Sequence, residues 1–372
     1  MNNMLFKGTG IIDPKIIYEK IDNNENLLIV DSDMSYINTF YKYLKGHGYE
    51  VKILNLRDTE KSHSWNLLDY PYQLYSDKKQ DKCLELLESI TKAIDFDNNS
   101  SNDPFWYMTA AELVKGIIFG LFEDADYNEI NLKSVWNILE GDNERFLNSD
   151  KLTNYFKTKP KMHPSYMSAS TTINAPTETK SSIIAVAKYK ISPLATKENL
   201  QSILVGNEIN IQDFKKEKQA VFILPHPIAG LYTSLVSIFI NQLYTYLQNV
   251  DYPKCNIIIS NLSHLGFMFN FDAMLENTQN NIGFLVNIES EERYMANYSY
   301  NAELLNRYEI ISTIDYVITS AEIDYPTTNK KEIPVFDLDK YFEKCGIKNE
   351  VYPDVNDIIR QIDNTLLEID NK

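Results

Sequence analysis

The sequence predicts an α/β protein with a mostly parallel sheet, helices on both faces of the sheet, and an all-α insertion. Short apolar runs end abruptly in polar residues, helical patterns lie between most of these runs, and a long middle segment has helical patterns only. Continuous apolar runs are typical of strands buried on both faces. Alternation of strands and helices is typical of a parallel sheet that is covered on both sides.

Each predicted strand is a short apolar run. The runs are residues 27–30, 51–56, 220–224, 256–259, 282–286 and 316–318, with a short first strand at 4–6. Two helical stripes lie between them. Tyr36, Phe40, Tyr43 and Leu44 share one face, and Leu235, Phe239, Leu243 and Leu247 share the other.

The middle of the chain predicts a separate helical domain. Asp103 and Pro104 are a capping residue and a first-turn proline, and a buried stripe follows them at Trp106, Ala110, Leu113, Ile117 and Leu121. We therefore expect an α/β domain at 1–75 and 165–325 and an all-α insertion at 76–164. A small tail at 326–372 would carry one amphipathic helix with Ile358, Ile362, Leu366 and Ile369.

The composition narrows the classes of function. The 372 residues are 44% hydrophobic, with 36 basic against 52 acidic residues and a net charge of −16. Lys157, Lys159 and Lys161 are the only basic cluster of note, and we interpret them as a solvated loop. Direct nucleic-acid binding by the isolated chain is therefore disfavoured, since it requires clustered cations.

The cysteines and the hydropathy predict a cytoplasmic chain. Cys83, Cys255 and Cys345 lie far apart without a C-x-x-C pair, which indicates reduced thiols and neither a disulfide scaffold nor a metal site. The N-terminus lacks the apolar core of a signal peptide. No run approaches the ~20 apolar residues of a membrane span, and polar residues break the longest candidate, 231–247.

Several short motifs occur in a recognisable order. Residues 26–56 read as a strand, an acidic turn, a helix and a Gly-Tyr-x-Val strand, and residues 220–247 as a strand and a helix ending in Gln-Leu-Tyr. The others are Ser64-Trp65-Asn66-Leu67-Leu68, Asp103-Pro104-Phe105-Trp106 and Thr179-Lys180-Ser181-Ser182-Ile183. Over residues 4–324 this order resembles the TraG/TraD-type coupling ATPases of type IV secretion and conjugation. The resemblance implies a RecA-like α/β domain.

The position of the family's phosphate-binding loop lacks the required residues. A P-loop reads G-x-x-x-x-G-K-[ST], because its backbone amides cradle phosphates and its lysine binds the terminal ones. Here Gly8, Thr9 and Gly10 lead into Asp13-Pro14-Lys15, and neither alignment register places a lysine at the lysine position. Pro14 has no amide hydrogen to donate, and Asp13 would repel phosphate. A plain turn is the simpler interpretation of Gly8-Thr9-Gly10.

The other nucleotide-site positions lack their charges as well. Ser260 and Asn261 stand where the family carries Asp-Glu for magnesium and water activation, although magnesium prefers carboxylate oxygens. Asp31 begins the segment that matches the family's Asp-Pro-Lys-Gly-Glu turn, again without a lysine. The arginine region at 278–283 has no arginine, and the expected glutamine appears as Asn287 or Glu289.

Other chemical groups have simple structural interpretations. His226 and His264 follow predicted strand ends, where parallel sheets bind ligands, but no nucleophile accompanies them. Ser260 lacks a G-x-S-x-G turn. The acidic residues Glu123, Asp124, Asp126 and Glu129 are not spaced as a calcium loop and read as a solvated loop.

The resemblance and its mismatches together imply a non-catalytic pseudo-ATPase, a paralogue of a coupling protein that acts as a scaffold or regulatory subunit of a conjugative or mobile-element machine. We expect no cofactor, no metal and protein partners, either further copies of the chain or an intact coupling ATPase. Two alternatives stay open. One is a divergent nucleotide-binding ATPase, and the other is a DNA-translocation module that is active only when assembled.

Overall fold

The computed structural model describes residues 3–94, 104–141, 151–228, 231–248, 253–277, 281–292, 294, 310–316, 320–328 and 332–347. The chain forms two compact units. Unit 1 comprises 1–99 and 193–333, and unit 2 comprises 100–192 and 334–372. These bounds differ from the expected boundaries at 75–76, 164–165 and 325–326. The predicted tail helix at 358–369 lies outside the described residues.

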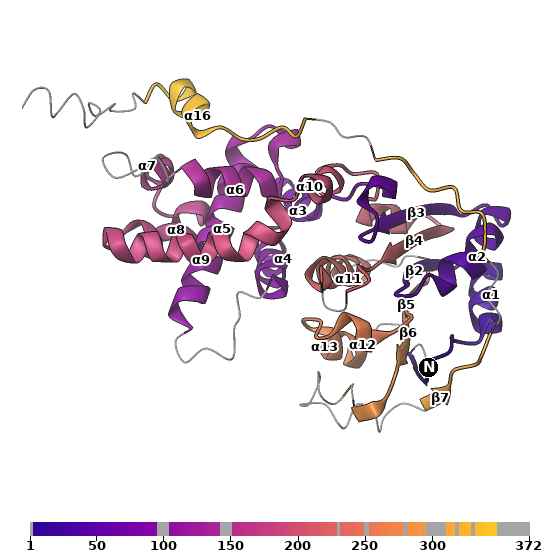
Figure 1. The fold of residues 1–372 in the computed structure, drawn as a ribbon. Helices are drawn as coiled ribbons and strands as arrows, with labels where there is room; N and C mark the ends of the chain where they lie inside the picture. The colour runs from indigo at the N-terminus through magenta and orange to yellow at the C-terminus, as the bar shows by residue number, and fades with distance from the viewer. Residues whose placement is uncertain are drawn as a thin grey trace, which may run out of the picture. The chain divides into compact units, whose positions relative to one another are not determined.

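A seven-stranded parallel sheet forms the centre of unit 1, in the order β3-β4-β2-β5-β6-β1-β7 (Figure 1). The strands are β1 (Met4–Lys7), β2 (Asn26–Val30), β3 (Glu50–Asn55), β4 (Gln219–Leu224), β5 (Cys255–Ile259), β6 (Ile282–Ile288) and β7 (Ile310–Ser312). Every residue of β2, β4, β5 and β6 is buried. This confirms the strands predicted from continuous apolar runs. Of the run predicted at 316–318, Tyr316 lies outside any strand and 317–318 lie outside the described residues, while β7 forms earlier, at Ile310–Ser312.

Helices cover both faces of this sheet (Figure 1). The helices of unit 1 are α1 (Pro14–Asp22), α2 (Ser35–Gly46), α3 (Asp69–Ser76), α4 (Gln80–Ala93), α10 (Glu198–Ile203), α11 (Thr233–Leu247), α12 (Leu262–Leu265) and α13 (Phe271–Glu276), with short 3-10 helices η1 (Thr59–Lys61) and η4 (Ile211–Lys215). The face with α1 and α2 buries Ile17, Phe40 and Leu44 against Ile29 and Phe222. The apolar stripe predicted for residues 36–44 therefore faces the core.

Every regular element among the described residues of unit 2 is a helix. Its elements are α5 (Phe105–Asp124), η2 (Tyr127–Glu129), α6 (Leu132–Glu140), α7 (Lys151–Lys157), α8 (Pro164–Ile173), α16 (Leu338–Lys344) and most of α9 (Thr177–Ala195). α5 packs closely on α8 because Gly116 has no side chain; a Cβ there would lie 2.9 Å from the Ser165 carbonyl oxygen. The Ser165 hydroxyl also donates to the Gly116 carbonyl at 2.8 Å.

α5 is long and apolar enough to cross a membrane by length and composition, with a mean hydropathy of 1.3. The capping residues and the buried stripe predict this helix, but its apolar length was missed, because 231–247 was identified as the longest apolar run. Of the apolar window in α5, 72% is buried inside the protein, as expected for the core helix of a helical domain.

Candidate functional site

The predicted site residues gather where the parallel strands end. The carboxyl ends of parallel strands meet at one edge of a sheet, so residues following different strands become neighbours. Asn287, near the end of β6, donates a hydrogen bond from its side-chain Nδ2 to the Gly10 carbonyl oxygen at 3.1 Å. Ser260, after β5, accepts the amide of Ser32, the residue after Asp31, at 2.8 Å. The structure thus joins Gly10 to Asn287 and the Asp31 turn to Ser260.

The loop between β1 and α1 stands where a phosphate-binding loop would be, and protein groups already bind its amides. The Gly8 amide donates to the Ile288 carbonyl at 3.2 Å. Gly10 donates to the Thr313 hydroxyl at 3.2 Å, and Ile11 exchanges amide bonds with Ile314 at 3.1 and 3.0 Å. The Ile12 amide donates to the Tyr36 hydroxyl at 2.9 Å. Thr9 is exposed.

Close contact with the segment after β7 explains the two glycines of this loop. A Cβ on Gly8 would lie 2.2 Å from the Thr313 hydroxyl, and one on Gly10 would lie 2.2 Å from the Ile314 carbonyl oxygen. Gly8 also has a φ of 137°, a conformation that L side chains rarely adopt. The close approach of Thr313 and Ile314 therefore explains why both positions are glycine.

The first turn of α1 is capped by its own side chain. Asp13 accepts the Lys15 amide at 3.0 Å, and Pro14 occupies the first turn, where it contributes no amide hydrogen. The N-terminus of a helix favours an anion because of its free amides and its dipole. In α1 the Asp13 carboxylate supplies that anion.

Asp31 is a buried acid at the end of β2. Its Oδ2 accepts the Ile37 amide at 2.8 Å, and its Oδ1 has no hydrogen-bond partner among the described residues. Burial raises the pKa of Asp31 to about 8, because the charged form is desolvated. The neighbouring Asp33 raises this pKa as well.

Ser260 and Asn261 hold the backbone of the site together. Besides the bond from Ser32, Ser260 donates its own amide to the Val30 carbonyl at 2.9 Å. The Asn261 side chain caps α12 by accepting the His264 amide at 3.2 Å. The adjoining arginine region is described only from Asn281 onward, because 278–280 lie outside the described residues. Among the described residues no group of three or more His, Cys, Asp or Glu side chains is placed to hold a metal ion.

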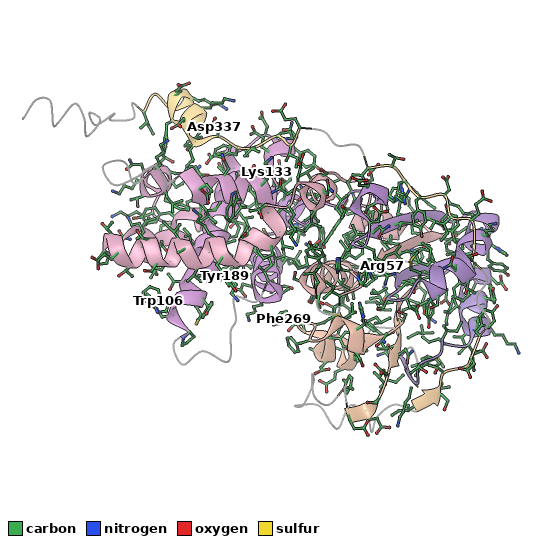
Figure 2. The ribbon with its side chains drawn as sticks, viewed as in Figure 1. Arg57, Trp106, Lys133, Tyr189, Phe269 and Asp337 are labelled. Carbon is green, nitrogen blue, oxygen red and sulfur yellow. The ribbon has the colours of Figure 1, made fainter. Side chains whose placement is uncertain are left out.

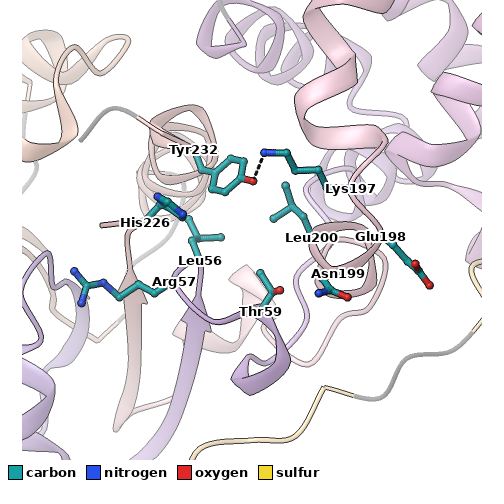
Figure 3. A pocket seen from close by; sticks show the side chains of 9 residues that line it. All are labelled: Leu56, Arg57, Thr59, Lys197, Glu198, Asn199, Leu200, His226 and Tyr232. Carbon is teal, nitrogen blue, oxygen red and sulfur yellow. Dashed lines mark hydrogen bonds between the residues drawn. The ribbon is translucent and has the colours of Figure 1, made fainter. Parts of the chain in front are cut away.

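A pocket of about 390 Å³ lies beside the ends of β3 and β4 in unit 1 (Figure 3). Its lining residues are Leu56, Arg57, Thr59, Lys197, Glu198, Asn199, Leu200, His226 and Tyr232. Sequence reasoning identified His226 and missed the other eight. Arg57 could have been found, because it follows the predicted strand at 51–56 directly. Lys197 and Tyr232 are brought to the pocket by tertiary structure.

Hydrogen bonds fix the polar groups of this pocket. Arg57 donates from Nε to the Pro225 carbonyl at 3.0 Å and from a terminal nitrogen to the Ser32 carbonyl at 2.7 Å, which holds it among the strand ends (Figure 2). Lys197 donates to the Tyr232 hydroxyl at 2.7 Å. His264 does not line the pocket, but its Nε2 lies 2.9 Å from the His226 carbonyl oxygen.

Two sequence interpretations in unit 2 are wrong at one residue each, while Lys157, Lys161, Glu123 and Asp126 are exposed as expected. Lys159 belongs to the cluster interpreted as a solvated loop, yet it is buried and forms an ion pair with Asp124. Asp124 also accepts the Tyr155 hydroxyl at 2.8 Å, so it is no part of a solvated acidic loop. Neither position could be identified as buried from the local sequence, because the partners are 31 and 35 residues apart.

The prediction of reduced thiols is consistent with the structure of the described residues. All three are free, with Cys83 and Cys255 buried and Cys345 exposed. Burial raises the pKa of the Cys83 thiol to about 12, so this side chain behaves as a small apolar group.

Comparison with solved structures shows the same fold in a conjugative coupling protein. TrwBdeltaN70, in a trigonal form with sulphate, matches with a TM-score of 0.58 and 14% identity over 82% of this chain and 68% of the other. The plasmid coupling protein TrwB in complex with ADP and Mg²⁺ matches with a TM-score of 0.58 and 13% identity over the same shares. The RecA-like fold is therefore confirmed. No curated protein matches the chain.

The family model for type IV secretory system conjugative DNA transfer matches residues 5–300. This range contains the sheet strands β1 to β6, the loop before α1 and most of unit 2. The chain therefore belongs to the type IV secretory system conjugative DNA transfer family.

Proposed function

We propose that this chain is a non-catalytic member of its family, a pseudo-ATPase that acts as a scaffold or regulatory subunit of a conjugative or mobile-element machine. The observation that carries the proposal is the bonding of the loop at 8–12. Its amides at Gly8, Gly10, Ile11 and Ile12 donate to protein groups. A phosphate would have to displace these partners to receive the same amides.

The charges around this loop support the same conclusion. Asp13 occupies the start of α1, where its carboxylate opposes the approach of phosphate. Ser260 and Asn261 offer no negative charge to magnesium, and both side chains are used in hydrogen bonds. ATP hydrolysis depends on a positioned nucleotide and on charge stabilisation by a lysine and a metal ion. We therefore expect neither nucleotide turnover nor a bound cofactor.

The partners and the compartment follow from this role. A scaffold without turnover works through protein surfaces, and we propose either self-association or binding to an intact coupling ATPase. We place it in the cytoplasm, on the grounds of its free cysteines and of an apolar helix that is buried in its own domain.

The test is release of phosphate from ATP by the purified full chain, with magnesium, in the presence and absence of DNA. We expect no release above background. Turnover of about 1 s⁻¹ or more, at the low end of ordinary enzymes, would overturn the proposal in favour of a divergent ATPase.

A matched variant separates turnover by this chain from turnover by a contaminant. Lys7 and Lys15 are the lysines that flank the loop, and Lys7 already pairs with Glu291 at 2.8 Å. A contaminant's activity would be the same in preparations of Lys7→Ala and Lys15→Ala. Activity that drops in either variant would belong to the chain and would contradict the proposal.

A further inference from the structure

The pocket beside β3 and β4 carries positive charge that no ion pair within the described part of the chain neutralises. Arg57 donates to two uncharged carbonyl oxygens, Lys197 donates to the Tyr232 hydroxyl, and neither cation forms an ion pair among the described residues. This is unusual in a chain with 52 acidic and 36 basic residues, where acids outnumber cations. Unpaired cations that share a pocket produce a local field that attracts anions.

The nearest acids do not cancel this field. Glu198 lines the pocket, but its carboxylate turns away from Lys197 and Tyr232 (Figure 3). Asp58, next to Arg57 in the chain, is paired with Lys61 at 3.1 Å.

Neutral donors complete the pocket. Nδ1 of His226 accepts the Ile228 amide at 3.1 Å, so a neutral imidazole carries its proton on Nε2 and can donate from there. Thr59 and Asn199 add a hydroxyl and an amide, and Leu56 and Leu200 supply apolar walls. Most of the lining residues are polar or charged, so the pocket suits a polar ligand.

We propose that this pocket binds a small phosphate-bearing anion, held by Lys197 and His226, while Arg57 adds positive charge from its place among the strand ends. A phosphate group matches the set because it accepts several charge-assisted hydrogen bonds at once. The site is not the loop at 8–12. Four strand spacings separate β4 from β1 in the sheet, or about 19 Å.

The electrostatics of His226 agree with this proposal. Burial lowers the pKa of His226, and the positive charges of Lys197 and Arg57 lower it further, as does His264. These groups approach His226 from α10, from the end of β3 and from α12, and Tyr232 packs against its ring with centroids 5.7 Å apart. A bound anion would stabilise the imidazolium and raise the pKa of His226.

The experiment titrates the full chain with inorganic phosphate and with pyrophosphate, by calorimetry and by the NMR signals of the histidine rings. We expect saturable binding and an increase in the pKa of His226, whose signal is assigned with His226→Gln. Lys197→Gln should weaken binding about tenfold, as for the loss of one charge-assisted hydrogen bond. Lys42→Gln, an exposed lysine of α2, is the matched control and should leave binding unchanged.

Three results would overturn the proposal. One is the absence of saturable binding in the millimolar range, and another is an equal loss in Lys197→Gln and Lys42→Gln, which would indicate general charge attraction. The third is binding of a short single-stranded oligonucleotide without binding of either phosphate, which would assign the pocket to nucleic acid. Thermal unfolding of each variant by circular dichroism checks that the fold is intact.

Discussion

Asp31 is the buried acid whose ionisation the fold opposes. Burial raises its pKa from 3.8 in the unfolded chain to about 8 in the folded one, so the folded state binds the proton more tightly. The contribution of Asp31 to stability is therefore complete below pH 4 and is lost as the pH rises toward 8, by up to about 1.4 kcal/mol per pH unit.

Asp31→Asn should remove this dependence on pH. An asparagine oxygen can still accept the Ile37 amide, and it carries no charge to desolvate. We expect the free energy of unfolding of the wild type to fall relative to the variant between pH 5 and pH 8, as measured by urea denaturation. Asp315→Asn, at an exposed position away from Asp31 in the sequence, is the control. Parallel curves for the wild type and Asp31→Asn would contradict the assignment.

Gly10 tests whether steric contact explains the glycines of the β1–α1 loop. Gly10→Ala would place a Cβ 2.2 Å from the Ile314 carbonyl oxygen, and backbone atoms cannot easily move away. We expect it to destabilise the protein by about 1–3 kcal/mol. Gly46→Ala is the matched control. With nothing within 4 Å of its Cβ, it should be neutral or stabilise α2 by up to about 1 kcal/mol. Equal unfolding midpoints for the two variants would show that the loop has room for a side chain.

At the scale of elements, the sequence predicted the buried strands well because their residues are apolar on both faces. β2, β4, β5 and β6 all fall within two residues of the predicted runs. β7 was missed, since a three-residue strand at the sheet edge with half-exposed side chains leaves little hydropathy signal. Its neighbours Thr313 and Ile314 nevertheless bind the loop at 8–12, so the closure of that loop could not be predicted from local sequence.

The candidate sites were predictable to a smaller extent. Strand ends located Asp31, Ser260 and Asn287, because apolar runs mark where strands stop. The phosphate pocket depends on Lys197 and Tyr232, which lie 35 residues apart and meet only in the folded chain. The burial of Lys159 could not be predicted either, because its partner Asp124 is distant in the sequence and its neighbours Lys157 and Lys161 suggest a charged surface.

The junction of α5 and α7 offers a prediction at this scale. Lys159→Met would remove the ion-pair partner of Asp124, whose side chain is 9% exposed, and leave it the hydrogen bond from the Tyr155 hydroxyl. We expect the free energy of unfolding to fall by about 3–5 kcal/mol. Adding Asp124→Asn should restore part of this stability, because the amide is neutral and can still accept the Tyr155 hydroxyl. Lys161→Met, at an exposed position, is the control. Chemical denaturation measures the effect for the wild type, the three single variants Lys159→Met, Asp124→Asn and Lys161→Met, and the double variant. Additive losses in Lys159→Met and Asp124→Asn would contradict a coupled pair.

The net charge of the whole molecule affects its affinity for DNA, which the family is named for transferring. With a net charge of −16 the chain as a whole repels a phosphate backbone, and binding would require a local surface of clustered cations. The basic cluster noted in the sequence offers only two exposed lysines, Lys157 and Lys161, because Lys159 is buried and paired with Asp124.

We therefore predict no sub-micromolar affinity of the isolated full chain for single- or double-stranded DNA near physiological salt. Filter binding over a range of salt concentrations is the measurement, because each phosphate contact steepens the decline of affinity with salt. A sub-micromolar affinity with a steep slope would contradict the prediction, and its loss in a Lys157→Gln, Lys161→Gln variant would locate the surface. Affinity that arises only after an intact coupling ATPase is added would instead favour the translocation module that is active when assembled. In that case, the cations that contact DNA would belong to the assembly, and the acidic chain would contribute its protein-binding surfaces.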